Sequence, residues 1–244
     1  MSVILGNGYL TMKTTPQIFS KLSYEFTCLK EQNTMELHQQ LDRKEMRELA
    51  LQAAIKLIAQ RGLHGLSFRK IASTMGCKMD DLYPIFENLD DLILQVNTRT
   101  LDELYTLISE TEQDSSEPEA CLLGFGYTYL QFAIEQPLRW NAIFEHRLTR
   151  GAKVPNWYQN KILRLFSLVE KPLRESMPTL EPNVCAQATR ALWGSVHGIC
   201  VLALTKKFDV VGTESAQELM RLLMISFLTG LKTQYLIKQY VDLF

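Results

Sequence analysis

The sequence predicts an all-α protein, on three observations. Glycine and proline, which end or interrupt helices, number only 12 and 8 among 244 residues. From residue 43 almost to the end, apolar residues recur at the three- and four-residue steps of an amphipathic helix. No segment alternates apolar and polar residues for long enough to predict a strand. With 46% hydrophobic residues and a net charge of −1, the composition also excludes a disordered chain, a collagen-like chain and a polycationic nucleic-acid coat.

The cysteines and the apolar runs predict a cytoplasmic protein with no membrane partner. A typical apolar run, residues 199–204, is far shorter than the ~20 residues needed to cross a bilayer. The N-terminus has no basic segment followed by an apolar one, so no secretory signal is expected. The cysteines stand singly, form no CxxC pair and are odd in number, which favours reduced thiols over a disulfide framework or a zinc site: Cys28, Cys77, Cys121, Cys185 and Cys200.

Residues 1–42 form an N-terminal extension that Gly6, Gly8 and Pro16 interrupt. Three interpretations stay open for it. It is a disordered tail, which we favour because chain termini are commonly loose, or a short helix packed on the body, or a segment upstream of a true start at Met35.

Four helices are predicted in residues 43–110, and cap residues mark their ends. Gly62 closes the first helix. Ser67 suits the N-cap of the second, which Gly76 ends. A third short helix then ends near Pro84, and Asn88 can cap a long fourth helix over residues 89–110.

Five further helices follow a polar stretch at residues 111–117. Ser116 and Glu119 have capping-box spacing ahead of the first of them. The predicted ranges are 121–134, 138–148, 157–175, 182–205 and 213–240. Helix-breaking residues lie at or near the boundaries, at Pro155, Pro172, Pro178, Pro182 and Gly212.

The arrangement of the second and third helices predicts contact with DNA. Short helices joined by a tight turn are typical of proteins that place one helix in the major groove. We expect Ile71, Ala72 and Leu82 to form the contact between the two helices, since the small Ala72 allows close approach. Gly76 supplies the flexible residue of the turn. The pattern therefore predicts a helix-turn-helix.

A series of short motifs runs without a gap from residue 44 to residue 104. They are Ala53-Ala54, Leu57-Ile58, Arg61-Gly62, Leu66-Ser67-Phe68-Arg69-Lys70-Ile71-Ala72, Met75-Gly76-Cys77, Leu82-Tyr83, Phe86 and Asp90-Asp91-Leu92. With this spacing the region resembles the N-terminal domain of tetracycline-repressor-type (TetR-type) transcriptional regulators. The resemblance implies a DNA-binding domain over residues 44–104 in which residues 67–86 read operator DNA.

Shorter motifs lie in residues 118–205. They are Tyr129-Leu130-Gln131-Phe132-Ala133, Gln136-Pro137, Phe144 and Ala191-Leu192-Trp193-Gly194-Ser195-Val196-His197-Gly198. This part resembles the C-terminal domain of the TetR-type subgroup named for its Trp-His-Gly residues. The resemblance implies a helical ligand-binding and dimerisation domain over residues 118–244. It also implies a homodimer that represses genes until a small molecule enters this domain.

The segment predicted to read DNA departs from the family pattern. Members usually have a small hydroxyl residue, Lys, Gly and a small residue before Leu-Tyr, where this chain has Lys78-Met79-Asp80-Asp81. Pro84 takes a position that is commonly aromatic or His, and Leu89 takes that of a Lys that touches the DNA backbone. Acids here weaken phosphate binding, although they also favour a helix N-terminus and can accept a hydrogen bond from cytosine N4. An alternative function is therefore a helix-turn-helix-derived scaffold or binding protein with weakened or lost DNA binding.

The basic residues near this segment keep duplex DNA as the first choice of partner. Residues 43–100 carry nine Lys and Arg against seven Asp and Glu, whereas residues 101–244 have an excess of acids. The predicted DNA-binding residues are Ser67, Arg69, Lys70, Lys78, Met79, Asp80, Asp81 and Tyr83.

Residues 121–166 are rich in aromatic side chains, most of which we expect to be core. Ligand sites in helical bundles form between helices, with apolar walls and a few polar groups. The predicted effector is accordingly apolar or amphipathic, and Asn141 and Arg147 are further candidate polar groups. The predicted ligand-binding residues are Phe125, Tyr129, Phe132, Trp140, Phe144, His146 and His197.

The last two long predicted helices suit a dimer interface. Two helices from each protomer would make a two-fold four-helix contact, although intramolecular packing of the same residues stays open. An enzyme is not expected, because the chain has no Gly-rich phosphate loop and no GxSxG motif. No cofactor or metal is predicted, since His197 and Cys200 alone make a poor metal site. The residues expected at the interface are Trp193, Gly194, Ser195, Gly198, Leu202, Leu219, Leu222, Leu223 and Phe227.

Overall fold

The computed structural model describes residues 43–113, 117–212 and 215–241. The N-terminal extension lies outside the described residues, and so does the capping box predicted at Ser116. The same holds for Thr213, the predicted start of the last helix.

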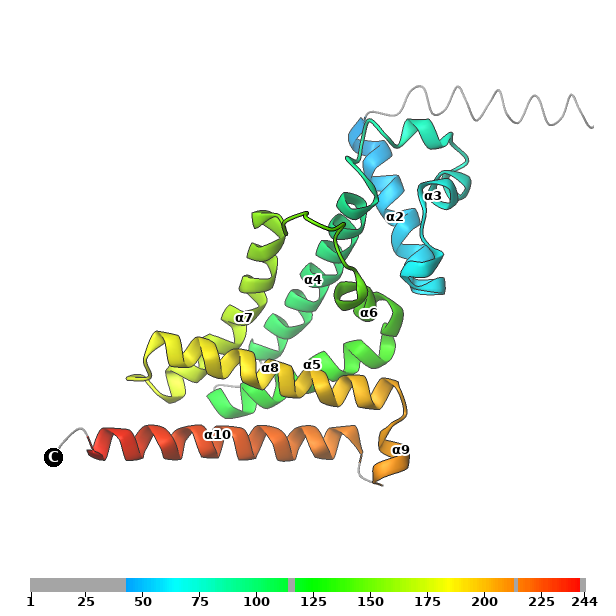
Figure 1. Ribbon diagram of the computed structural model, residues 1–244. Helices are drawn as coiled ribbons and strands as arrows, with labels where there is room; N and C mark the ends of the chain where they lie inside the picture. Colours follow the sequence, from blue (N-terminus) through cyan, green and yellow to red (C-terminus); the bar gives the residue numbers. More distant parts are fainter. Residues whose placement is uncertain (1–42, 114–116, 213–214, 242–244) are drawn as a thin grey trace, which may run out of the picture.

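All regular structure in the described residues is helical, which confirms the all-α prediction (Figure 1). Two of the elements are single 3₁₀ turns, η1 and η2. The elements are α2 (Arg43–Arg61), η1 (Leu63–Gly65), α3 (Phe68–Met75), η2 (Met79–Asp81), α4 (Leu89–Gln113), α5 (Pro118–Glu135), α6 (Pro137–Glu145), α7 (Asn156–Ser176), α8 (Pro182–Leu204), α9 (Phe208–Val211) and α10 (Ala216–Val241).

Most predicted helix ranges are confirmed within a few residues, and three details are wrong. Helix α6 ends at Glu145 rather than at residue 148, and α9 has no counterpart in the predictions. Helix α4 continues through the first part of the predicted polar stretch, to Gln113. Pro172 lies in the last part of α7, near the predicted boundary, and both Pro172 and its neighbour Leu173 are buried.

The predicted caps of α3 and α4 are confirmed by their hydrogen bonds and backbone conformation. The Ser67 hydroxyl accepts a hydrogen bond from the Lys70 backbone N–H at 3.3 Å, at the start of α3. Gly76 ends α3 with a φ of 71°, a left-handed conformation that glycine adopts without strain. Asn88 Oδ1 accepts from the Asp91 N–H at 2.9 Å and so caps α4.

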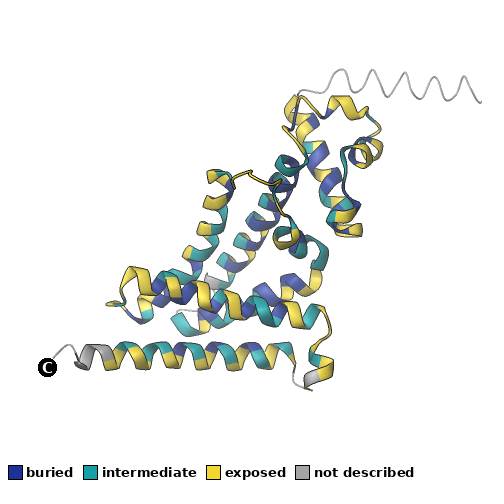
Figure 2. Ribbon diagram, viewed as in Figure 1, coloured by how far each residue is buried: buried dark blue, intermediate teal, exposed yellow. Residues whose placement is uncertain are grey.

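Two main apolar cores lie along the molecule, and α4 takes part in both. The first core is built from α2, α3 and the start of α4, with Leu92 and Val96 among its members. The second joins α5, α7, α8 and α10 to the end of α4, which contributes Leu104 and Ile108. Figures 1 and 2 show α4 running from the end that holds α2 and α3 to the packed helices at the other end.

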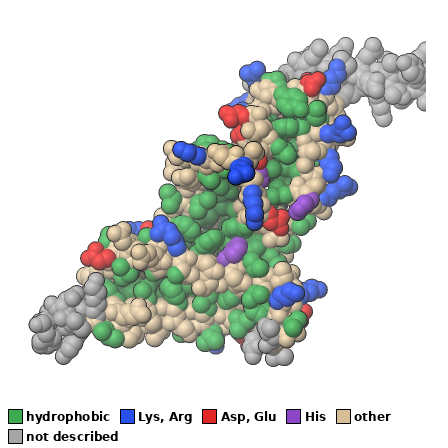
Figure 3. All heavy atoms as spheres, in the orientation of Figure 1, with side chains coloured by type: hydrophobic (Ala, Val, Ile, Leu, Met, Phe, Trp, Pro, Cys, Tyr) green, Lys and Arg blue, Asp and Glu red, His purple; other side chains and the backbone are tan. Residues whose placement is uncertain are grey.

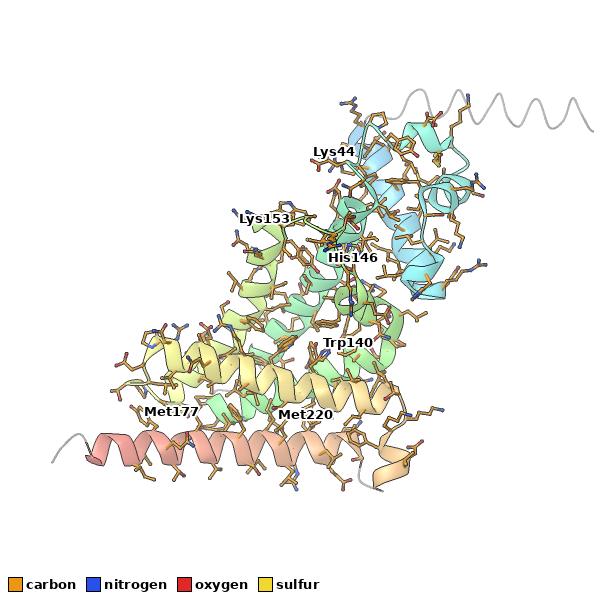
Figure 4. All side chains as sticks on the ribbon, in the orientation of Figure 1. Lys44, Trp140, His146, Lys153, Met177 and Met220 are labelled. Atoms are coloured by element: carbon orange, nitrogen blue, oxygen red, sulfur yellow. The ribbon has the colours of Figure 1, made fainter. Side chains whose placement is uncertain are left out.

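At the contact between α5 and α10, Gly126 faces two methionine side chains of α10. A Cβ atom built on Gly126 would stand 2.8 Å from Met224 Cε and 3.2 Å from Met220 Sδ. Glycine therefore lets α10 approach α5 at this level, and Figure 4 places Met220 between α10 and the helices above it.

The described helices include none with a stretch long and apolar enough to span a bilayer.

Candidate functional site

The structure contains a helix-turn-helix unit formed by α3, the turn after Gly76 and η2. Ile71, Ala72 and Leu82 are all buried in the first core, which confirms the predicted contact between the two elements. Phe68 and Phe86 stack nearby, with ring centroids 6.4 Å apart. The unit thus has its own packed interior and one outward face.

The second element of this unit is shorter than predicted. In place of a third short helix, Met79–Asp81 form a single 3₁₀ turn, and turns continue to Ile85. An α-helix through this segment would need a backbone N–H at position 84 to reach the Asp80 carbonyl, and proline has none. The Asp81 carboxylate instead accepts a hydrogen bond from the Lys78 backbone N–H at 2.9 Å, which stabilises the tighter turn.

The predicted DNA-binding residues lie on or beside α3 and η2, with different degrees of exposure. Arg69 and Lys70 on α3 are exposed, and so are the four residues 78–81. Tyr83 is 52% exposed, and its ring edge packs on Phe68 with centroids 5.5 Å apart. Ser67 is half-buried, and its hydroxyl oxygen serves as the α3 cap. Figure 3 shows Lys and Arg side chains projecting from this end of the molecule.

The two acids of the turn differ in their surroundings. Asp81 holds the turn through its bond to Lys78, so its carboxylate has a structural role. Asp80 is exposed, and no hydrogen bond or ion pair from the described residues reaches its carboxylate. Leu89, at the start of α4, is half-buried against the first core. Of the three departures from the family pattern, Asp80 therefore brings the one uncompensated charge.

A cavity of about 270 Å³ lies within the second part of the molecule, among α4, α5, α6, α7, α8 and α10. Three predicted ligand-binding residues line it: Phe125, Tyr129 and Phe144. Sequence reasoning missed most of the wall, which α4, α7 and α8 supply: Leu101, Leu104, Ile108, Tyr158, Ile162, Leu165, Phe166, Val169, Leu192, Trp193 and Val196. In the sequence these residues appear as apolar residues at helical spacing, and residues of a filled core follow the same spacing.

The other four predicted ligand-binding residues do not line the cavity. Phe132 and Trp140 are buried in the second core. His197 stacks on Trp140 with ring centroids 4.6 Å apart, behind the cavity wall. His146 lies further off, where the loop after α6 meets the start of α4, as Figure 4 shows.

One polar contact adjoins the cavity. The Tyr129 hydroxyl lies 3.2 Å from His197 Nδ1. Burial raises the pKa of Tyr129, so the phenol stays protonated. Burial also lowers the pKa of His197, which favours a neutral imidazole. The pair is therefore an uncharged hydrogen-bonded contact at neutral pH.

A clasp of three side chains joins α4 to the loop after α6; we use the name for Asp90, Thr149 and His146. Asp90 Oδ2 accepts hydrogen bonds from the Thr149 backbone N–H at 2.9 Å and from its hydroxyl at 2.6 Å. His146 Nε2 lies 3.3 Å from Asp90 Oδ1. The Thr149 hydroxyl is the main reason that the pKa of Asp90 is lowered, whereas burial lowers the pKa of His146.

The outward faces of α8 and α10 are apolar and exposed. Leu222 and Ile225 on α10 are 61% and 49% exposed, and Val201 and Leu202 on α8 are exposed too. A Cβ atom added at Gly194 or Gly198 would meet nothing within 4 Å. Other residues expected at the interface, including Trp193, Leu223 and Phe227, are partly buried against the second core, and their place at an interface stays a prediction.

Within the part of the chain that the structure describes, no three His, Cys, Asp or Glu side chains gather closely enough to hold a metal ion.

Comparison with known proteins agrees with this architecture. Residues 122–227 match the family described as tetracyclin repressor-like, C-terminal domain. That description does not name the Trp-His-Gly subgroup, which stays a prediction. Two curated relatives are named uncharacterized HTH-type transcriptional regulators. One, from Mycobacterium tuberculosis, is 23% identical and covers 69% of this chain and 75% of its own; the other, from Bacillus subtilis, is 23% identical and covers 75% and 91%.

Three solved structures share the fold. A protein of unknown function from Rhodococcus sp. RHA1 has a TM-score of 0.64 at 17% identity, over 75% of this chain and 93% of its own. A TetR-family regulator from Bordetella parapertussis has a TM-score of 0.53 at 18% identity, over 75% and 93%. FadR from Bacillus subtilis, solved with stearoyl-CoA, has a TM-score of 0.57 at 14% identity, over 75% and 98%.

The family match over residues 122–227, the curated relatives and the shared all-helical fold agree with one another, and together they support a transcriptional regulator of the TetR type.

Proposed function

We propose that this protein is a cytoplasmic repressor that binds operator DNA as a homodimer and releases it when an apolar or amphipathic small molecule enters the cavity. In this proposal residues 44–104 bind DNA, and residues 118–244 bind the effector and dimerise. The observation that carries it is the pairing of a helix-turn-helix at one end of α4 with an apolar cavity at the other.

The exposed faces of α8 and α10 support dimerisation. These faces carry exposed leucine, isoleucine and valine side chains, which are more stable when they are buried against partner helices than in contact with water. Two glycines on α8 leave room for a close approach. A second copy related by a two-fold axis would cover the same face on both protomers. Two helix-turn-helix units could then reach two half-sites on one side of a duplex.

Phosphate contacts are proposed for Arg69, Lys70, Lys78 and Tyr83, which are exposed on one face. The short η2 turn presents Met79 and Asp80 to the groove in place of a full helix. This arrangement supports modest affinity, because few cations face the backbone and one carboxylate opposes them.

Helix α6 supports a route from the cavity to the DNA-binding part. Ala142 belongs to the first core, and its carbonyl accepts a hydrogen bond from Asn97 Nδ2 of α4 at 3.0 Å. The next two residues, Ile143 and Phe144, line the cavity. Two residues later, His146 reaches Asp90 in the clasp. A ligand that moves Phe144 would therefore pull on the start of α4, directly behind the DNA-reading turn.

A ligand-binding assay with duplex DNA tests this function and its route together. We expect saturating 2-naphthol, a neutral bicyclic probe, to weaken binding to DNA from upstream of the protein's own gene by about tenfold or more. Fluorescence anisotropy with a labelled fragment measures the change. In the Asp90→Ala, Thr149→Val double variant no side-chain oxygen remains at position 90 to accept from residue 149, so the clasp is lost and we expect the same ligand to have little effect on DNA affinity.

Glu145→Gln is the matched control, because it also removes one carboxylate near the clasp but from an exposed side chain. It should respond to 2-naphthol like the natural protein. A full ligand response in the clasp variant would contradict the route through α6. A DNA affinity that the ligand leaves unchanged in the natural protein would contradict ligand-controlled repression.

The alternative of a scaffold that kept the fold and lost DNA binding finds its support in Asp80 and the short η2 turn. It has less support than the regulator, since the curated relatives are named as HTH-type regulators.

A further inference from the structure

The walls of the cavity carry no charged side chain, although charged residues are common on the helices that form it. We propose that its ligand is electrically neutral and mainly hydrocarbon, about the size of a bicyclic aromatic molecule, and that carboxylates and phosphate esters are excluded. This inference rests on the proposed function, in which the cavity is the effector site.

The few polar groups in the wall are uncharged. Tyr129 bonds to His197, as described above. Burial raises the pKa of Tyr158, so this phenol is also neutral. Neither hydroxyl can therefore balance the charge of an anionic ligand.

The basic side chains of α7 next to cavity residues contact groups outside the cavity. Lys161, next to the cavity residue Ile162, pairs with Asp102 at 2.7 Å. Arg164, next to Leu165, lies over the ring of Tyr105 at 3.7 Å from its centroid. Both basic residues thus contact α4 outside the cavity, and the wall between them is apolar.

The opening of the cavity is apolar as well. Phe144, Phe166 and Trp193 line the cavity and are also partly exposed to solvent, so they form its rim. Their rings contact one another, with centroids 6.1 Å apart for Phe144 and Trp193 and 5.6 Å for Phe166 and Trp193. Figure 3 shows hydrophobic side chains gathered on this face of the molecule.

Size and charge together define the ligand class. A cavity of ~150 Å³ with similar walls holds benzene, so about 270 Å³ suits a molecule of roughly two fused rings or an aliphatic molecule of similar bulk. An ionised group buried in such walls loses its hydration and gains no partner. A neutral ligand loses little water and fills the space.

Three related probes test the proposal: naphthalene, 2-naphthol and 2-naphthoate. Isothermal titration calorimetry near neutral pH compares their affinities for the full-length protein. We expect naphthalene and 2-naphthol to bind, and 2-naphthoate to bind at least about a hundredfold more weakly than 2-naphthol, because only its charge is uncompensated.

A charge introduced at the rim should reverse the exclusion. Phe166→Lys places an ammonium group at the cavity, and we expect 2-naphthoate to bind this variant at least about tenfold more tightly than it binds the natural protein. Leu163→Lys adds the same charge to α7 at a side chain that is 53% exposed and outside the cavity lining. This control should leave the order of the three probes unchanged.

Two outcomes overturn the proposal. One is equal binding of 2-naphthoate and 2-naphthol to the natural protein, and the other is failure of both neutral probes to bind. Neither result bears on DNA binding, which is measured separately without ligand. Loss of DNA binding with the predicted probe order would conversely contradict only the regulatory function.

Discussion

The Leu222→Glu, Ile225→Glu double variant is expected to be a monomer that no longer retards operator DNA. Both side chains lie on the outward face of α10 and are largely exposed, so the change places no charge in the protomer's own core. In the proposed dimer the four introduced carboxylates would be buried together across the two-fold axis. Loss of the second half-site contact should weaken binding to the operator by ~10²–10⁴-fold.

Sedimentation velocity and a gel shift on the same preparation measure the two effects. Leu163→Glu is the control, because Leu163 is similarly exposed but lies on α7. It should remain dimeric and bind DNA. A double variant that stays dimeric would show that the protomers meet elsewhere, and the proposed arrangement of half-sites would be wrong.

The Asp80→Gly, Leu89→Lys double variant should bind duplex DNA more tightly, and with a stronger dependence on salt. Asp80 is the acid of the turn with no partner among the described residues, and Leu89 starts α4 beside the same face. A lysine can keep its methylene groups on the apolar core while its ammonium group reaches solvent. One new phosphate contact per protomer steepens the slope of log K against log salt by about 0.9, or about 1.8 for the dimer.

Nonspecific DNA of fixed length, titrated over a range of salt concentrations, gives both the affinity and the slope. Asp80→Asn separates the charge from the backbone effect of glycine, and it should tighten binding less. Asp81→Ala should instead weaken the turn, because it removes the carboxylate that accepts the hydrogen bond from the Lys78 N–H. Unchanged affinity and slope in the double variant would show that this face does not meet phosphate.

The helices and their caps could be predicted because they depend on local chemistry. Ser67, Gly76 and Asn88 act on backbone groups within four residues, so their roles are legible in the sequence. The short η2 turn was harder to see, since the family resemblance predicts a helix there. Pro84 is nevertheless visible in the sequence, and its missing backbone N–H accounts for the 3₁₀ turn in place of the expected helix.

The cavity could be predicted only in part. Phe125, Tyr129 and Phe144 stood out because aromatic residues are conspicuous among candidate ligand contacts. Aliphatic wall residues such as Leu101 and Ile162 follow the same helical spacing as core residues, so no local signal separates them. Whether a buried stripe faces a neighbour or an empty space depends on how six helices pack, which is a property of the whole fold. The clasp was missed for a similar reason, since Asp90 and Thr149 are far apart in the chain.

The central claim is that residues 67–86 of two protomers lie against one duplex. Hydroxyl-radical footprinting of the natural protein on DNA from upstream of its own gene, in dilute buffer, tests it most directly. We expect a dimer that protects two patches on one face of the duplex, separated by about 34 Å or a multiple of it, with protection fading as salt is raised. A protein that stays monomeric and leaves every position of the fragment unprotected, even at the lowest salt, would contradict the claim.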